Sequence, residues 1–182
     1  QPNVLDSISV GGLFTPDYWN YAMFKSISEN NGQPVSPGTL GYLIDNSHPI
    51  FHKEFASDTY SDWQWWCIAK NSRPLILDSA KVHLPVIVRA IDNVERNHNL
   101  AVLFECRIGA GRMIVNTTNL DSISSYREGR QYIKALAEYC SSPINDNIPQ
   151  VSYKSILDLF HCQIVEKEIR GVKNRSNYKR KK

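Results

Sequence analysis

The chain holds 182 residues, of which 42% are apolar and 21% are charged. This composition fits one folded domain with a buried core and excludes a chain that is disordered throughout. No stretch approaches ~18 consecutive apolar residues, so the sequence predicts no transmembrane span. Residues 166–182 contain eight of the 21 basic side chains and two of the 18 acidic side chains. We therefore expect a single, slightly acidic domain over residues 1–165, a flexible basic tail over residues 166–182, and no nucleic-acid partner.

The first half of the chain alternates helical and extended patterns. Thr15-Pro16-Asp17 is typical of a helix start, and Asn30-Asn31-Gly32 is typical of a helix end. A second helix is predicted from about Ser61 to Lys70. Short apolar runs predict strands at residues 39–44, 75–77 and 85–91.

The second half begins with the clearest local signal. Residues 100–118 alternate apolar and polar side chains around Gly109-Ala110-Gly111, which predicts a β-hairpin. Two amphipathic helices follow, each with an apolar stripe that we expect to be buried. The stripes contain Ile133, Leu136, Ala137 and Cys140 in the first helix, and Tyr153, Ile156, Leu157 and Phe160 in the second. This order of elements favours an α/β sheet with helices on its faces and an antiparallel edge.

A cluster of tryptophans is the most unusual motif. Trp63, Trp65 and Trp66 lie beside Asp62 and Gln64. Exposed aromatic rings bordered by carboxylates and amides bind sugars, through the C–H faces and the hydroxyl groups of the sugar ring. On one helix, residues 62 and 66 would point one way and residue 63 the other, so at least one ring is expected in the core. Packing in a core or an interface is the simpler interpretation, and a carbohydrate platform is the alternative.

Three carboxylates precede and begin the same segment. Glu54, Asp58 and Asp62 are spaced by four residues and would form an acidic stripe on a helix. Two such groups could serve as acid and base on a glycosidic bond. The simpler alternative is a solvated face with Asp62 as a helix N-cap, because this spacing recurs by chance.

A polar segment between two predicted strands offers another candidate. It contains Asp92, Asn93 and Arg96. Such a segment is either a ligand-binding loop at a strand end or a connection whose side chains bond to nearby backbone groups. The two interpretations predict different burial and different hydrogen-bond partners for these side chains.

The sequence offers no clear metal site or nucleophile. His48 and His52 are separated by Pro49, which argues against a metal-binding helix and favours a turn followed by a surface histidine. None of the four cysteines belongs to a C-x-x-C pair or to a glycine-flanked nucleophile elbow. We therefore expect no metal, no cofactor and no catalytic residue of that kind. Cys106 and Cys140 lie at apolar positions and are expected to be buried.

Several of these segments together resemble a known family. The blocks are Phe14–Trp19, Gly38–Gly41, Asp62–Trp66, Arg73–Asp78, Ile91–Asn93 and Gly109–Arg112. In this order, over residues 10–142, they resemble a C-terminal region of bacterial glycoside hydrolase family 2 proteins, the β-galactosidase-like enzymes. That region is similar to class I glutamine-amidotransferase-like domains that serve as non-catalytic oligomerisation modules.

The resemblance implies a fold and a role. It implies a flavodoxin-like, three-layer α/β sandwich, here in a truncated form, in a periplasmic or secreted protein. It also implies an accessory domain that acts in polysaccharide breakdown by protein association or weak carbohydrate binding. The partner would be a second copy, a glycosidase or an oligosaccharide. The alternative is a glycoside hydrolase that uses carboxylates near Glu54, Asp58 and Asp62, and no catalytic residue of the parent enzymes carries over to this chain.

Overall fold

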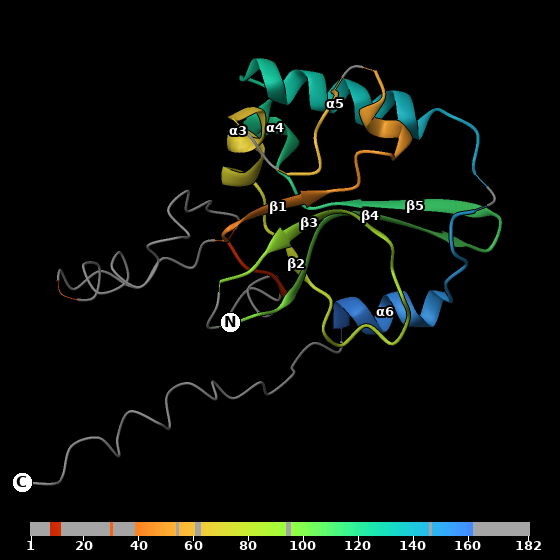
Figure 1. Ribbon diagram of the computed structural model, residues 1–182. Helices are drawn as coiled ribbons and strands as arrows, with labels where there is room; N and C mark the ends of the chain where they lie inside the picture. Colours follow the sequence, from red (N-terminus) through yellow and green to blue (C-terminus); the bar gives the residue numbers. More distant parts are fainter. Residues whose placement is uncertain are drawn as a thin grey trace, which may run out of the picture.

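A five-stranded sheet forms the centre of the computed structural model (Figure 1). The structure describes residues 8–11, 30, 39–53, 55–60, 63–93, 96–145 and 147–161. Apart from residue 30, the helix predicted near residues 15–31 lies outside these ranges, as does the basic tail at residues 166–182. The strands are β1 (Gly41–Ile44), β2 (Leu75–Ile76), β3 (Val86–Ile91), β4 (Asn99–Ile108) and β5 (Gly111–Asn116). They lie in the order β1-β3-β4-β2, and β5 also pairs with β4.

Every ladder between these named strands is antiparallel. The mixed α/β class predicted from the sequence is therefore observed, with an open antiparallel sheet. A flavodoxin-like sheet is parallel, because a crossover helix joins each strand to the next. In the described part of this chain, a short connection joins β3 to β4 and a tight turn joins β4 to β5. The strand direction thus differs from the one that the family resemblance implies.

The predicted hairpin is confirmed. Strands β4 and β5 pair from Leu103 opposite Asn116 to Ile108 opposite Gly111, which leaves a two-residue turn. Gly109 occupies this turn with a φ of 58°, a conformation that is costly for residues with a Cβ. Strand β4 is the longest of the named strands and pairs with β2, β3 and β5.

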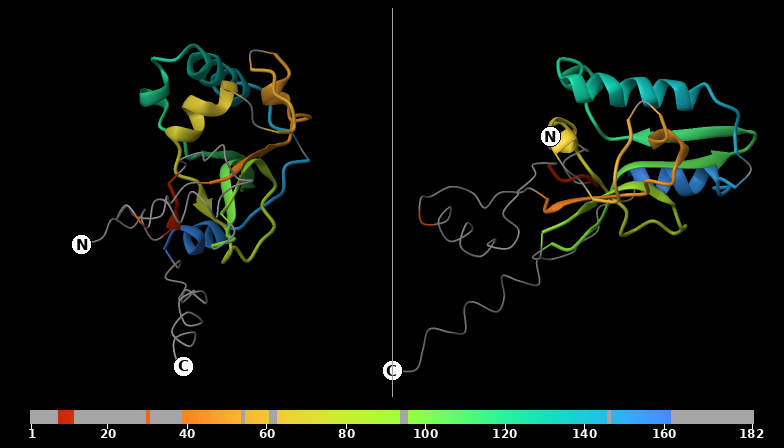
Figure 2. Two further views of the ribbon diagram at one scale, coloured as in Figure 1. Left: turned by 60° about the vertical axis from the view of Figure 1, so that its left-hand side comes forward. Right: turned by 45° about the horizontal axis from the view of Figure 1, so that its top comes forward.

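Helices cover both faces of the sheet (Figure 2). One face carries α3 (Trp66–Lys70), α4 (Leu120–Ile123), α5 (Arg127–Cys140) and two short 3-10 helices, η2 (Pro49–Phe51) and η3 (Trp63–Trp65). The opposite face carries α6 (Tyr153–His161) and the β2–β3 loop. None of the helices in the described ranges has the length and hydropathy needed to cross a membrane.

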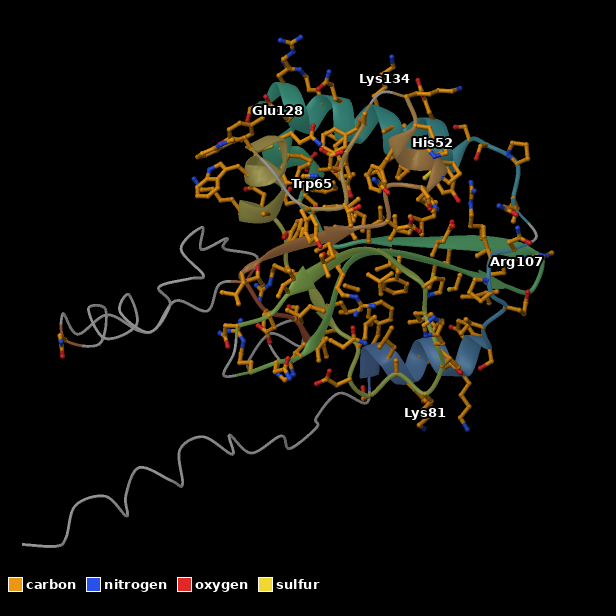
Figure 3. The ribbon with its side chains drawn as sticks, in the orientation of Figure 1. His52, Trp65, Lys81, Arg107, Glu128 and Lys134 are labelled. Atoms are coloured by element: carbon orange, nitrogen blue, oxygen red, sulfur yellow. The ribbon has the colours of Figure 1, made fainter. Side chains whose placement is uncertain are left out.

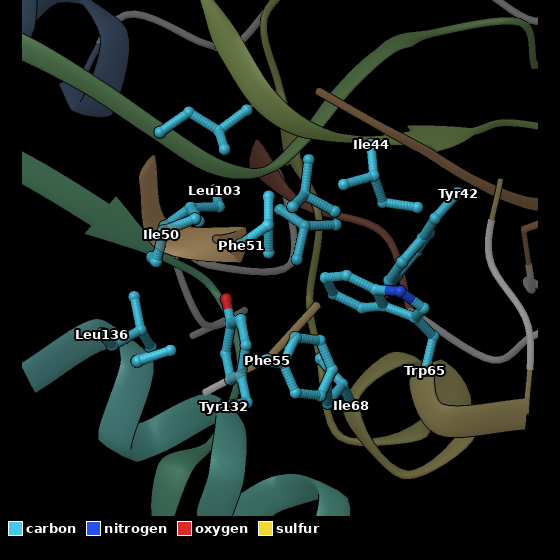
Figure 4. Packing of buried hydrophobic residues seen from close by; sticks show 14 of the residues in the cluster. Tyr42, Ile44, Ile50, Phe51, Phe55, Trp65, Ile68, Leu103, Tyr132 and Leu136 are labelled. Carbon is cyan, nitrogen blue, oxygen red and sulfur yellow. The ribbon is translucent and has the colours of Figure 1, made fainter. Parts of the chain in front are cut away.

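The face below α5 has an aromatic core (Figure 4). Trp65 packs edge-to-face against Phe55 and Tyr42, with ring centroids 5.1 and 5.8 Å apart. Helix α5 contributes Tyr132 to the same cluster, with its ring 5.8 Å from that of Trp65. Edge-to-face pairs place the positive edge of one ring against the negative face of another, so the cluster is held by more than burial.

The buried stripe of α5 differs from the predicted one. Tyr132, Leu136 and Tyr139 are buried, whereas Ala137 and Cys140 are exposed. The large tyrosine rings bury more surface than Ala137 and Cys140 would, and their phenol groups find partners inside the protein. The prediction that Cys140 is buried was wrong.

The opposite face has a mainly aliphatic core. Leu75, Leu77 and Phe104 on the sheet side pack with Ile156 and Leu159 of α6. Cys106 belongs to this cluster and is buried, as predicted. Tyr153 and Leu157, which were expected on the buried stripe of α6, are exposed.

Candidate functional site

The tryptophan run divides between the core and the surface. Trp65 is only 1% exposed, and its indole Nε1 donates a hydrogen bond to Ser57 Oγ at 2.8 Å. Trp63 is 85% exposed and Trp66 is 38% exposed. The rings of Trp63 and Trp66 lie 6.2 Å apart at an interplanar angle of 46°. The expectation that at least one ring enters the core is met by Trp65.

The three-residue spacing of Trp63 and Trp66 explains this division. Residues 63–65 form a 3-10 helix and residues 66–70 an α-helix. In a 3-10 helix, side chains three residues apart lie nearly above one another. Trp63 and Trp66 therefore lie on the same side. Residues three apart are also neighbours on an α-helix, so the prediction that residues 63 and 66 point in different directions was wrong. We call the exposed pair Trp63 and Trp66 the aromatic face. Tyr60, three residues earlier in the sequence, is also exposed.

Polar groups next to the aromatic face are partly used to hold the segment in place. The Gln64 side chain donates to the backbone carbonyl of Ala56 at 2.9 Å, so its amide nitrogen stabilises the preceding loop. Asp58 is exposed. Asp62, the fifth residue of the predicted carbohydrate site, lies outside the described residues.

The predicted acidic stripe does not form on a helix. Residues 56–60, which include Asp58, have no helical structure, so a four-residue spacing does not align carboxylates there. Glu54 and Asp62 lie outside the described residues. Within the ranges that the structure describes, this segment therefore offers one exposed carboxylate and no acid/base pair.

The polar side chains after β3 form hydrogen bonds with neighbouring groups of the same connection. The Asp92 carboxylate is buried and accepts hydrogen bonds from the backbone N–H of Asn93 at 2.8 Å and of His98 at 3.0 Å. Arg96 forms an ion pair with Asp92 at 2.6 Å. The Asn93 side-chain oxygen accepts from the backbone N–H of Arg96 at 2.9 Å. Of the two interpretations of this segment, the structure agrees with the hydrogen-bonded connection.

A second polar cluster was not identified from the sequence. Glu105 on β4 is buried, and its Oε1 lies 3.0 Å from Nε2 of His48. The phenol of Tyr139 donates to both carboxylate oxygens at 2.9 Å. The ring of His48 also contacts the ring of Tyr139, with centroids 4.8 Å apart. His48 is thus half-buried against Tyr139, whereas His52, which follows the turn, is exposed as predicted.

Arg112 completes this cluster from β5. Its guanidinium lies 4.5 Å from the ring centroid of Tyr139 and donates to the carbonyls of Tyr139 and Cys140 at the end of α5. Burial alone would raise the pKa of Glu105, but the hydrogen bonds from His48 and Tyr139 and the charge of Arg112 lower it below its ordinary value. Burial and the bond to Glu105 raise the pKa of Tyr139 to about 12.

This second cluster, defined by His48, Glu105, Arg112 and Tyr139, stabilises the fold. It ties β4, β5, η2 and α5 together, and both oxygens of Glu105 are engaged. The alternation along β4 did reveal that Glu105 faces away from Cys106. It did not reveal that α5 covers that side of the sheet.

The two buried thiols, Cys67 and Cys106, are poor nucleophiles. Burial, together with the negative charge of Glu128, raises the pKa of Cys67, and burial and Glu105 raise that of Cys106. The described residues also contain no group of three His, Cys, Asp or Glu side chains arranged to hold a metal ion.

Comparison with known proteins identifies one family, whose model matches residues 2–161. The chain belongs to DUF8487, a domain of unknown function. The match includes the whole described sheet, the aromatic face and the cluster around Glu105, so these are parts of the DUF8487 domain. No curated protein matches the chain.

Proposed function

We propose that this DUF8487 domain is a non-catalytic accessory domain that binds carbohydrate through its aromatic face. The carrying observation is the exposure of the adjacent rings of Trp63 and Trp66. Large aromatic side chains are usually mostly buried, and isolated exposed ones need no explanation. Neighbouring exposed rings on one short segment are instead typical of a binding surface.

The aromatic face is held rigidly from behind. Trp65, between the two exposed rings in sequence, is fixed by Phe55, Tyr42 and the hydrogen bond to Ser57. A ligand that stacks on Trp63 and Trp66 would therefore find the backbone of both residues already ordered. Preorganisation of this kind lowers the entropic cost of binding.

The shape of the pair favours a sugar chain as the ligand. Two rings inclined at 46° offer two separate flat faces, and successive rings of an oligosaccharide also turn relative to one another. Sugar C–H faces pack on aromatic rings, while the exposed carboxylate of Asp58 and the phenol of Tyr60 can bond hydroxyl groups. The resemblance to the C-terminal region of family 2 glycoside hydrolases supports the same ligand class, and with it a periplasmic or secreted setting.

The test is a titration of the full chain with plant-polysaccharide oligosaccharides, followed by tryptophan fluorescence. We expect saturable quenching that Trp63→Ala and Trp66→Ala remove, because each change deletes one stacking surface. Tyr153→Ala is the matched control, since Tyr153 is an exposed aromatic residue on α6, across the sheet. Trp65→Ala is not a suitable probe, because that ring lies in the core.

Two results would reject carbohydrate binding. One is the absence of quenching with every glycan in the panel, and the other is quenching that survives both Trp63→Ala and Trp66→Ala. Light scattering tests the other accessory role, which is association with a second copy of the chain. If the chain self-associates and Trp63→Ala makes it monomeric, the aromatic face serves protein association instead.

A further inference from the structure

A cavity with both polar and apolar lining lies on the opposite side of the sheet from the aromatic face (Figure 1). Its volume is about 690 Å³, and the β2–β3 loop, residues 77–84, forms most of its wall. Arg89 of β3 and Asn99 of β4 complete the lining. In Figure 1 this loop lies beside α6, whereas α3 lies beyond the other face of the sheet. The cavity is in the size range of small-molecule sites in proteins.

Arg89 occupies an unusual place for a charged side chain. It lies on β3, between β1 and β4, and its neighbours in the sheet are Leu43 and Ala101. Ala101 is part of the aliphatic core below the sheet. A position of this kind normally carries an apolar side chain, because an arginine there must keep its guanidinium solvated or paired. At this position the sheet carries the polar side chain of Arg89, which lines the cavity, in place of an apolar core residue.

The groups around Arg89 are fixed by hydrogen bonds. Arg89 donates to the side-chain oxygen of Asn99. The backbone N–H of Asn99 donates to Asp78 Oδ1 at 2.8 Å, and Nδ1 of His98 lies 2.8 Å from Asp78 Oδ2. Both carboxylate oxygens of Asp78, which also lines the cavity, are thus engaged by Asn99 and His98. Among the residues that the structure describes, the guanidinium of Arg89 has an amide oxygen as its hydrogen-bond partner and no carboxylate.

The remaining lining is partly basic and partly apolar. Lys81 and His83 lie on the same loop and are exposed, and Lys81 also pairs with Asp158 at 3.3 Å. Leu77 and Leu84 are buried members of the aliphatic core and give the cavity an apolar side. A guanidinium presents N–H donors in a planar fork that matches a carboxylate or a phosphate.

We propose that this cavity binds a small organic molecule that carries a carboxylate or phosphate group. Arg89 contacts the oxyanion, Lys81 adds positive charge at the rim, the imidazole of His83 offers a hydrogen-bonding group, and the apolar side receives the carbon skeleton. The site is independent of the aromatic face, because the two lie on opposite sides of the sheet. A monosaccharide acid has the required size and chemistry.

The test is a titration of the full, isotope-labelled chain by NMR. The probes are glucuronate, glucose 6-phosphate and neutral glucose, which share a ring and differ in the oxyanion. We expect one or both anions to shift the amide signals of residues 77–84 in a saturable way, and we expect glucose to leave them unchanged. The anion that binds more tightly distinguishes a carboxylate ligand from a phosphate ligand.

Matched variants locate the contact. We expect Arg89→Gln to weaken binding by about tenfold or more and Arg89→Lys by less, because lysine keeps the charge but loses the fork. Lys81→Gln should weaken binding by roughly twofold, since its charge is exposed. Lys134→Gln is the control, because Lys134 is an exposed lysine on α5 that also pairs with a carboxylate (Figure 3).

Three outcomes would overturn the proposal. These are no saturable shift with either anion, equal shifts with glucose, or unchanged binding in both Arg89 variants. Anion binding that Lys134→Gln weakens as much as Lys81→Gln does would also count against it, because it would indicate diffuse attraction. If Arg89→Gln does not fold, Arg89→Lys and Lys81→Gln still decide the question.

Discussion

On the face covered by α5, the sheet packs against interlocking rings of Trp65, Phe55 and Tyr132, and a buried carboxylate closes the hairpin end of the layer. On the face covered by α6, the core is mainly aliphatic, and a cavity containing Arg89 interrupts it. The same five strands support both layers.

The difference shows where the molecule can hold a ligand. The rings of the aromatic core pack against one another, so we expect a ligand on this side to bind at the surface, on the exposed rings of Trp63 and Trp66. Beside the aliphatic core there is a cavity, so we expect a ligand on this side to bind within that cavity, next to Arg89. Three predictions test this comparison, and they are ordered by the size of the expected effect.

The largest effect is expected at the centre of the aromatic layer. Trp65→Ala should lower the free energy of unfolding by about 3–5 kcal/mol, because it removes a fully buried ring and leaves a cavity. Trp63→Ala, two residues away, should change it by no more than about 0.5 kcal/mol, because that ring is exposed. Urea denaturation measures both. Similar losses for the two variants would contradict the division of the tryptophan run.

The next effect concerns the polar end of the same layer. Glu105→Gln should destabilise the protein at pH 7 by roughly 1–3 kcal/mol, since it removes the charge that accepts from His48 and Tyr139. The pKa of Glu105 is lowered in the folded state, so its stabilisation is complete above the ordinary value of 4.5. It is lost as the pH falls below that value, through the folded pKa.

The measurement for Glu105 is a series of urea midpoints between about pH 3 and 7. The difference between the wild-type protein and Glu105→Gln should be largest at neutral pH and should shrink as Glu105 becomes protonated. Glu138→Gln provides the control, because Glu138 is an exposed residue of α5 in a long salt bridge of 3.8 Å. A difference that stays constant across the pH range would show that the charge of Glu105 contributes nothing.

The sequence predicted some elements well because their signals are local. The hairpin followed from period-two alternation and from a glycine turn, and both depend on neighbouring residues alone. The stripe of α5 was predicted one residue out of phase, because apolar type was counted and Tyr132 and Tyr139 were not. These errors concern the orientation of elements and not their existence.

The candidate sites were harder to predict because they depend on tertiary structure. Glu105 and Arg89 look like solvent-facing residues in their strands, and only the packing of α5 and the β2–β3 loop reveals their surroundings. The exposure of Trp63 and Trp66 depends on which side of their segment packs against the sheet, and helical periodicity alone does not give that side. The direction of the strands depends on pairing between distant segments.

The smallest effect tests whether the two layers open separately. Cys67 belongs to the aromatic layer and Cys106 to the aliphatic layer, and both are buried, whereas Cys140 is exposed. Cys140 should therefore react at once with a thiol reagent, while Cys67 and Cys106 should react slowly, through local opening. Ile156→Val removes one methylene group from the aliphatic layer, which costs about 0.5–1.5 kcal/mol. This should speed the labelling of Cys106 by roughly twofold to tenfold.

The matched change on the other side of the sheet is Ile44→Val, since Ile44 is a buried isoleucine of the aromatic layer. Labelling followed by peptide mass spectrometry gives a separate rate for each cysteine. If the layers open separately, Ile156→Val speeds Cys106 and spares Cys67, while Ile44→Val does the reverse. Equal acceleration of both thiols by either variant would show that the layers open as one cooperative unit. The cavity beside Arg89 would then be a rigid feature of the whole fold, and a ligand bound there should slow the labelling of Cys67 as much as that of Cys106.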